Sequence, residues 1–182
     1  MPANVQIVNE FFDNDSAQYY HELSSTRDVL FISDIRCAVP NKQQHKAGQK
    51  EADDVRIEQE ILVEMKSQED WIFHMQCKRA MLKFRLPYQY EYATHVNTTQ
   101  FLYVQGEIRL QAWAPRNSTE CRLVVEKNEI KQRKQTIYDC VEYEQQMCWI
   151  NNVHRAKGLD QFLDDRAMSR LDQHLREKKW SK

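Results

Sequence analysis

The sequence predicts a mainly β protein, in which a small closed barrel of five strands is followed by one or two helices. Three observations predict this fold class. Five segments between residues 29 and 131 have the composition of strands and are separated by polar turns. A glycine, Gly106, lies at the centre of one of these segments. Beyond residue 136, apolar residues recur at helical spacing.

The elements follow from local patterns along the chain. Residues 4–23 indicate a short element with a break at residues 13–16. The candidate strands are rich in β-branched residues or alternate between apolar and polar residues, and two of them end at a proline. They cover residues 29–39, 55–65, 71–86, 101–113 and 121–131. Loops or turns are expected at residues 40–54, 67–70, 88–100 and 117–120.

Gly106 decides the shape of the predicted sheet. A glycine inside a strand marks a bulge, a sharp bend at a barrel corner, or the close approach of another backbone. Barrel closure requires strongly bent strands, so the corner is the interpretation adopted, with a bulge in an open sheet or sandwich as the alternative. The face that contains Gly106 is assigned to the core. It carries Leu102, Val104, Ile108, Leu110 and Ala112.

The opposite face of this strand combines rings with a cation. Aromatic rings stack on bases and cations follow phosphates, so the face favours contact with single-stranded nucleic acid. Residues 71–134 hold eleven Lys or Arg against five acidic residues, which supports that interpretation. Packing beneath a helix or against a partner protein is the alternative. The predicted nucleic-acid residues are Phe101, Tyr103, Arg109, Trp113, Lys78, Lys83, Arg85, Arg122 and Lys131, and Arg79, Lys127 and Arg133 lie on the same segments.

An enzymatic function is not expected. The chain has no glycine-rich phosphate loop, no GxSxG and no HExxH motif, and its six histidines are scattered. We therefore predict no catalytic residue, no metal site and no cofactor. The five cysteines are never spaced as CxxC and are interpreted as small core residues of an intracellular chain without a secretory signal.

The last segment predicts an amphipathic helix after Gly158. Its apolar stripe either closes the barrel or meets a helix of another subunit, and the partner contact is favoured. The stripe consists of Leu159, Phe162, Leu163, Ala167, Leu171 and Leu175. The predicted division of the chain is an N-terminal extension over 1–26, the barrel over 27–136 and a helical region over 137–182.

The stretches YVQGEIRL and RLVVEKNEI resemble successive strands of the OB-fold small subunits of replication-protein-A-like complexes. In size and composition the chain also resembles the OB-fold telomere-capping proteins of the insect chromosome-end protection complex, modigliani and verrocchio. This resemblance implies an OB-like barrel in the nucleus, at chromosome ends. It also implies a subunit that binds single-stranded DNA and another OB-fold subunit. A protein-only adaptor is the alternative function.

Overall fold

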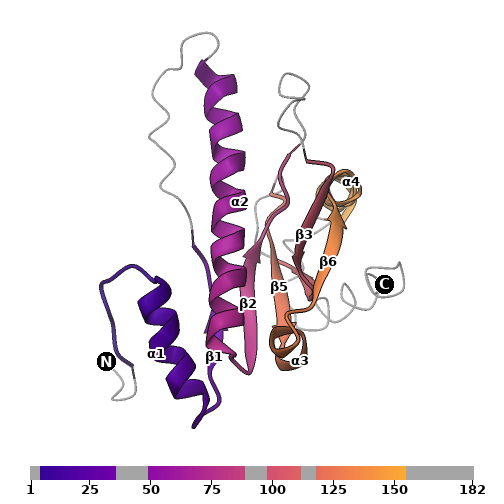
Figure 1. Ribbon diagram of the computed structural model, residues 1–182. Coiled ribbons are helices and arrows are strands. Elements are labelled where there is room, and N and C mark those ends of the chain that lie inside the picture. The colour runs from indigo at the N-terminus through magenta and orange to yellow at the C-terminus, as the bar shows by residue number, and fades with distance from the viewer. Residues whose placement is uncertain (1–4, 36–48, 89–97, 112–117, 155–182) are drawn as a thin grey trace.

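The computed structural model describes residues 5–35, 49–88, 98–111 and 118–154 (Figure 1). Within these residues the chain forms two β-sheets with helices packed around them, and neither sheet closes into a barrel. The predicted five-stranded OB-like barrel is therefore wrong. The C-terminal stripe from Leu159 to Leu175 lies outside the described residues, and the division into three regions stays a prediction.

The larger sheet has four strands in the order β1-β2-β5-β4. The short edge strand β1 runs parallel to β2, whereas β2, β5 and β4 pair antiparallel. The smaller sheet is an antiparallel pair of β3 and β6. The strands are β1 (Leu30–Ile32), β2 (Arg79–Phe84), β3 (Gln100–Val104), β4 (Glu107–Leu110), β5 (Cys121–Glu126) and β6 (Gln135–Asp139).

The core is formed by the facing sides of the two sheets together with buried residues of α2 and α4. Alternate residues of β2 and β5 are fully buried, which is the pattern of a sheet that packs through one face. At the centre, the Phe84 ring lies 6.1 Å from the Tyr103 ring of β3 and 5.1 Å from the Tyr138 ring of β6. The smaller sheet therefore covers the buried face of the larger one.

Gly106 lies where the chain passes from the smaller sheet to the larger one, between β3 and β4. A Cβ atom at this position would lie 2.6 Å from the backbone oxygen of Val124. Of the three explanations open to the sequence, the close approach of another backbone is the correct one. Because β3 and β4 belong to opposing sheets, their inward directions are opposite, which the prediction of one continuous strand missed.

The helix α2 (Gln49–Met75) replaces the end of the loop predicted over 40–54, a predicted strand, a predicted turn and the start of the next strand. Its buried positions recur with the period of a helix, but three of them are polar: Glu58, Gln68 and Glu69. These polar residues interrupt the apolar stripe, so the alternation over 55–65 dominated the sequence pattern. Each has a partner. The Gln68 amide, for example, accepts from the backbone N–H of Lys83 and donates to its carbonyl, extending the edge of β2 beyond the end of β1.

Three shorter helices complete the described fold. Asp13 caps the N-terminus of α1 (Asn14–Ser24) by accepting from the Ser16 N–H at 2.9 Å, so the predicted break at 13–16 is a helix start. The predicted strand 121–131 ends in α3 (Lys127–Lys131). Asp139 caps α4 (Cys140–Trp149), and a π-helical turn follows over Ile150–His154. The helical period beyond residue 136 correctly predicted α4, but residues 137–139 of the predicted helical region belong to β6, a strand that the sequence did not predict.

Candidate functional site

The aromatic residues predicted to bind nucleic acid lie in the core. Phe101 is 8% exposed and Tyr103 is fully buried, whereas the intervening Leu102 is half exposed. The Lys66 ammonium lies 5.2 Å from the centre of the Phe101 ring. Burial raises the pKa of Tyr103 well above its usual value. Neither ring is available for stacking on bases, and Trp113 lies outside the described residues.

Most of the predicted cations are neutralised by nearby carboxylates. On the outer face of the larger sheet, Arg109 pairs with Glu107 at 2.7 Å. Further pairs are Lys78–Asp28, Arg79–Glu126 at 2.7 Å, Arg85–Glu58 at 2.9 Å, and Lys83 and Arg122 with both Asp34 and Glu120. Among the predicted nucleic-acid residues, Lys131 makes no ion pair with the part of the chain that the structure describes. The predicted track of available cations along the strands is therefore absent from the described face.

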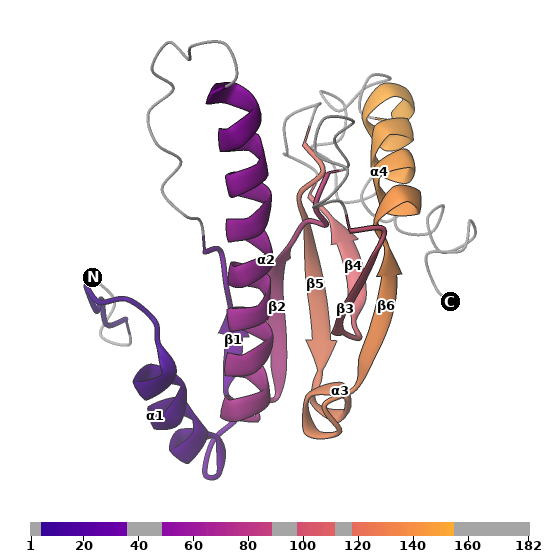
Figure 2. The same ribbon diagram turned by 45° about the horizontal axis from the view of Figure 1, so that its top comes forward.

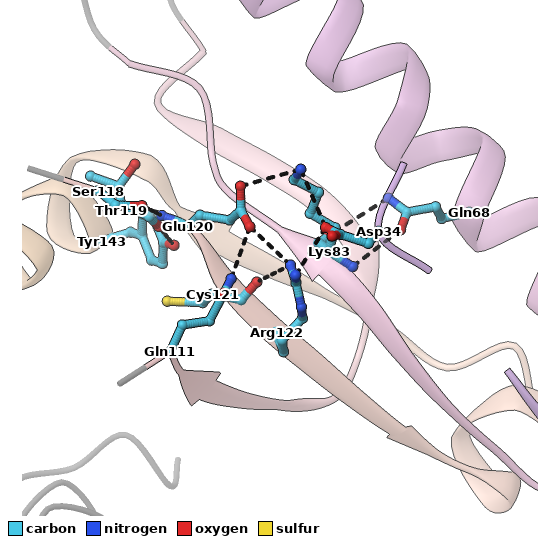
Figure 3. Close-up of polar contacts among 10 residues, drawn as sticks. All are labelled: Asp34, Gln68, Lys83, Gln111, Ser118, Thr119, Glu120, Cys121, Arg122 and Tyr143. Carbon is cyan, nitrogen blue, oxygen red and sulfur yellow. Dashed lines mark hydrogen bonds and ion pairs between the residues drawn. The ribbon is translucent and has the colours of Figure 1, made fainter. Parts of the chain in front are cut away.

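Four of these residues form a compact network, here called the polar lattice: Asp34, Lys83, Glu120 and Arg122 (Figure 3). Lys83 and Arg122 are directly opposite each other on β2 and β5, where two like charges would repel. Both acids bridge this pair. The Lys83 ammonium lies 3.4 Å from Asp34 and 3.3 Å from Glu120. The Arg122 guanidinium lies 2.9 Å from Asp34 and 3.0 Å from Glu120.

The charges of the polar lattice cancel, with two cations against two carboxylates. The Lys83 side chain is only 13% exposed, so its charge needs a close counter-charge to remain stable in this position. The Gln111 amide also donates to Glu120 at 2.9 Å, which further occupies that carboxylate (Figure 3). The polar lattice therefore holds the strands together and offers no excess charge to a phosphate.

The opposite end of the sheets carries an excess of positive charge, unlike the neutral polar lattice. The turn from α2 to β2 and the segment from β5 through α3 to β6 lie together at this end (Figure 2). Lys78 donates a hydrogen bond to Asp28, which lowers the pKa of that carboxyl, and the charge of Lys127 lowers it further. Six cations gather here against Asp28, Glu126 and Glu129, an excess of 6 − 3 = 3. We call them the basic end: Lys78, Arg79, Lys127, Lys131, Arg133 and Lys134.

Four residues of the basic end are exposed and make no ion pair with any described residue: Lys127, Lys131, Arg133 and Lys134. The sequence predicted Lys127, Lys131 and Arg133 to lie near a nucleic-acid surface, but Lys134 was not among the predicted residues. The prediction also grouped them with the paired cations of the strands. The signal that could have separated the two groups is the density of the charges, because all four fall within the eight residues 127–134 beside one acid, Glu129.

Arg133 has a backbone conformation that disfavours its side chain. Its φ angle is +49°, in the left-handed region where glycine is preferred. Two hydrogen bonds fix this turn, from the Arg133 N–H to Ile130 O at 3.1 Å and from the Lys134 N–H to Glu129 O at 2.9 Å. They are the bonds of a Schellman motif, whose left-handed position is usually a glycine. The Arg133 guanidinium lies 5.7 Å from the centre of the Phe73 ring at the end of α2.

The described residues contain no group of three or more His, Cys, Asp or Glu side chains arranged to hold a metal ion. Cys77, Cys121 and Cys140 are buried, as predicted, whereas Cys148 is exposed and Cys37 lies outside the described residues. Burial raises the pKa of Cys77 and of Cys140 to about 11, which opposes thiolate formation. None of the helices in the described ranges combines the length and apolar character needed to cross a membrane.

Comparison with known proteins identifies a different family from the one that the sequence resemblance suggested. The family model for the poly A polymerase regulatory subunit matches residues 1–168 of the 182-residue chain. No curated protein matches the chain. The assignment to insect telomere-capping proteins is therefore wrong, and with it the function as a subunit that binds single-stranded DNA at chromosome ends.

The partner prediction is correct only in its general form. A family of regulatory subunits implies a protein partner, but it gives no support to a chromosome-end complex or to single-stranded DNA. The alternative of a protein-only adaptor is no better supported. Since the match covers all but the last fourteen residues, the chain belongs to the poly A polymerase regulatory subunit family.

Proposed function

We propose that this chain binds a poly A polymerase and holds the backbone of the RNA at its basic end, without contributing a catalytic residue. The family match over residues 1–168 is the observation that carries this proposal. A poly A polymerase extends an RNA strand, so a subunit that assists it has a polyanion within reach. The basic end is the described surface whose charge suits that polyanion.

Charge pairing distinguishes the basic end from the other cations. A cation with a carboxylate partner at about 3 Å has little net field to offer, and the phosphate would have to displace that partner. This is the situation of Lys83 and Arg122. Lys127, Lys131 and Lys134 are exposed and lack such a partner among the described residues, so counterions that they displace from RNA contribute directly to affinity.

Two positions at the basic end are hard to explain by folding alone. Lys127 opens α3, where the helix dipole disfavours a cation. Arg133 occupies a left-handed position that glycine would adopt with less strain. Departures from local preference concentrate at functional sites, which supports a role for these side chains in binding.

The test is RNA extension by the poly A polymerase of the same organism, with and without this chain. The basic-end variant is Lys131→Gln with Lys134→Gln. Its matched control is Arg56→Gln with Arg109→Gln, which removes the same net charge from residues that are already ion-paired. We expect the polymerase to co-purify with all three forms, and the stimulation of extension to be lost only in the basic-end variant.

Two outcomes would contradict the proposal in different ways. If the unmodified chain neither binds the polymerase nor changes extension, the subunit function is wrong. If both double variants reduce the stimulation equally, the subunit function holds, but the RNA contact does not lie at the basic end.

A further inference from the structure

An extended apolar segment precedes α1. Val5, Ile7, Val8 and Phe11 are all more than half exposed, and Phe11 is 95% exposed. Residues 5–11, here called the arm, make no hydrogen bond with any described residue and have no regular secondary structure. The arm runs outside α1 and away from both sheets (Figures 1 and 2). Four such side chains in a short stretch are unusual on a surface that stays in water.

Phe12, the residue that follows the arm, is held in place by packing. The arm therefore leaves the fold in a defined direction. The ring of Phe12 packs 5.2 Å from Phe31 of β1 and 5.1 Å from Trp71 of α2. Asp13 then caps α1. The arm therefore leaves a well-packed anchor, and its apolar side chains lie beyond that anchor.

The edge strand β1 presents a second unpartnered feature. The Lys78 N–H donates to Val29 O, and the Ser33 N–H donates to Met81 O, so residues 29 and 33 direct their backbone groups toward β2. Because these groups alternate along a strand, Leu30 and Ile32 direct theirs to the outer edge. No described strand pairs there, and the side chains of Leu30 and Ile32 are 66% and 68% exposed.

An open apolar edge strand and an extended apolar segment are complementary. Addition of a strand would satisfy the outward backbone groups of β1 through main-chain hydrogen bonds, and would cover apolar side chains on both partners. The alternation Val5-Gln6-Ile7 gives the arm the period of a strand with one apolar face.

We propose that the arm of one copy of this chain adds as a strand to the β1 edge of a second copy, and that the exchange is reciprocal in a two-fold dimer. Both halves of the contact are present on one chain, and the arm departs away from its own β1. A closed two-fold pair therefore uses each half once per copy and leaves neither exposed. This inference does not rest on the proposed function.

The test is the oligomeric state of the full chain, measured by sedimentation equilibrium across a wide concentration range. The arm variant is Ile7→Asp, and the edge variant is Ile32→Lys. The matched control is Ile137→Lys, which changes an equally apolar, 61% exposed residue of the smaller sheet. We expect a dimer whose dissociation constant rises at least tenfold in the arm and edge variants, and less than twofold in the control.

A mixing experiment separates exchange from any other kind of dimer. An equimolar mixture of the arm and edge variants contains one intact arm and one intact edge, so it can rebuild one of the two contacts. We expect mixed dimers to form more tightly than either variant forms with itself. Ile32→Pro adds a backbone test, because it removes the outward N–H while the bonds from residues 29 and 33 to β2 remain.

Three results would overturn the proposal. The first is a chain that remains monomeric at every concentration. This includes a monomer whose own fold protects the arm from proteolysis. The second is a dimer that the arm and edge variants leave unchanged. The third is a mixture that associates no better than its two components alone.

Discussion

The cations at the two ends of the larger sheet are in opposite electrostatic states. At the polar lattice, Lys83 and Arg122 share two carboxylates at 2.9 to 3.4 Å. At the basic end, Lys127, Lys131 and Lys134 are exposed and have no carboxylate partner among the described residues. The number of basic residues in a segment therefore does not define a binding surface. What defines a binding surface is whether each cation has a carboxylate partner. A paired cation stabilises the fold, whereas an unpaired one remains available to a ligand.

The largest expected effect concerns the core that both ends share. Cys77 precedes the basic end, and Cys140 begins α4 at the other end of the sheets (Figure 2). Burial raises the pKa of each thiol from 9.0 to about 11. Below pH 9 the thiols are neutral in both states, whereas from pH 9 to 11 only the unfolded chain loses their protons. Stability is therefore fully present below pH 9 and falls as the pH rises to 11, by on the order of 2 kcal/mol for Cys77 and by less for Cys140, which fewer protein atoms surround.

Urea unfolding at a series of pH values measures this loss, and Cys77→Ala should remove its share of it. We expect one cooperative transition throughout, since both thiols belong to one core. A free energy of unfolding that stays constant from pH 9 to 11 would contradict this account of the interior.

The next effect distinguishes the two acids of the polar lattice. Glu120→Gln removes a carboxylate that is itself mostly buried beside Lys83 and Arg122, so we expect a loss of about 3 kcal/mol in the free energy of unfolding. Asp34→Asn changes a carboxylate that is largely exposed, and should lower it by less than about 1 kcal/mol. Urea unfolding at neutral pH compares the two. Equal losses would mean that burial does not set the strength of these pairs.

A smaller effect should appear when a paired cation of the basic end is released. Glu126→Gln removes the partner of Arg79 in an ion pair whose side chains are both more than half exposed. Such a pair contributes little to folding, so the stability should change by less than about 1 kcal/mol. The released charge should strengthen the binding of a short unstructured RNA by about threefold at low salt, measured by fluorescence anisotropy. Unchanged or weaker binding would show that RNA does not contact this end.

The smallest effect tests the strain at Arg133. Arg133→Gly relieves a left-handed conformation worth about 1 kcal/mol but loses the contact with Phe73, worth about 0.5 kcal/mol, so the fold should become slightly more stable. Arg133→Ala keeps the strain and loses the contact, so the fold should become slightly less stable. Both variants should bind RNA more weakly than the unmodified chain. Equal stability of the two variants would argue against strain at this residue.

Part of the fold could be predicted from the sequence. Strands were correctly predicted over 79–84 and 121–126, because each packs through one face and two of its three outward positions are charged. The helix α2 could not be recognised from an apolar stripe, because Glu58, Gln68 and Glu69 occupy buried positions and are stabilised by partners far away in sequence. The crossing at Gly106 depends on the backbone of β5, which no local pattern encodes.

The candidate site could be predicted only in part, for a related reason. The sequence correctly indicated a basic middle segment that includes Lys127, Lys131 and Arg133. It could not show which cations are neutralised, since Lys83 meets Asp34 across 49 positions and Arg85 meets Glu58 across 27. The orientation of Phe101 and Tyr103 was wrong because it relied on a strand that continues through Gly106.

The most direct test of the central claim is the salt dependence of RNA binding. The logarithm of the affinity for a short unstructured RNA is measured against the logarithm of salt concentration for three forms: the unmodified chain, Lys131→Gln with Lys134→Gln, and the control Arg56→Gln with Arg109→Gln. If the basic end holds the phosphates, the first double variant reduces the slope by about 1.4, and the control leaves it unchanged. Slopes that are equal in all three forms, or reduced equally in both double variants, would contradict the claim.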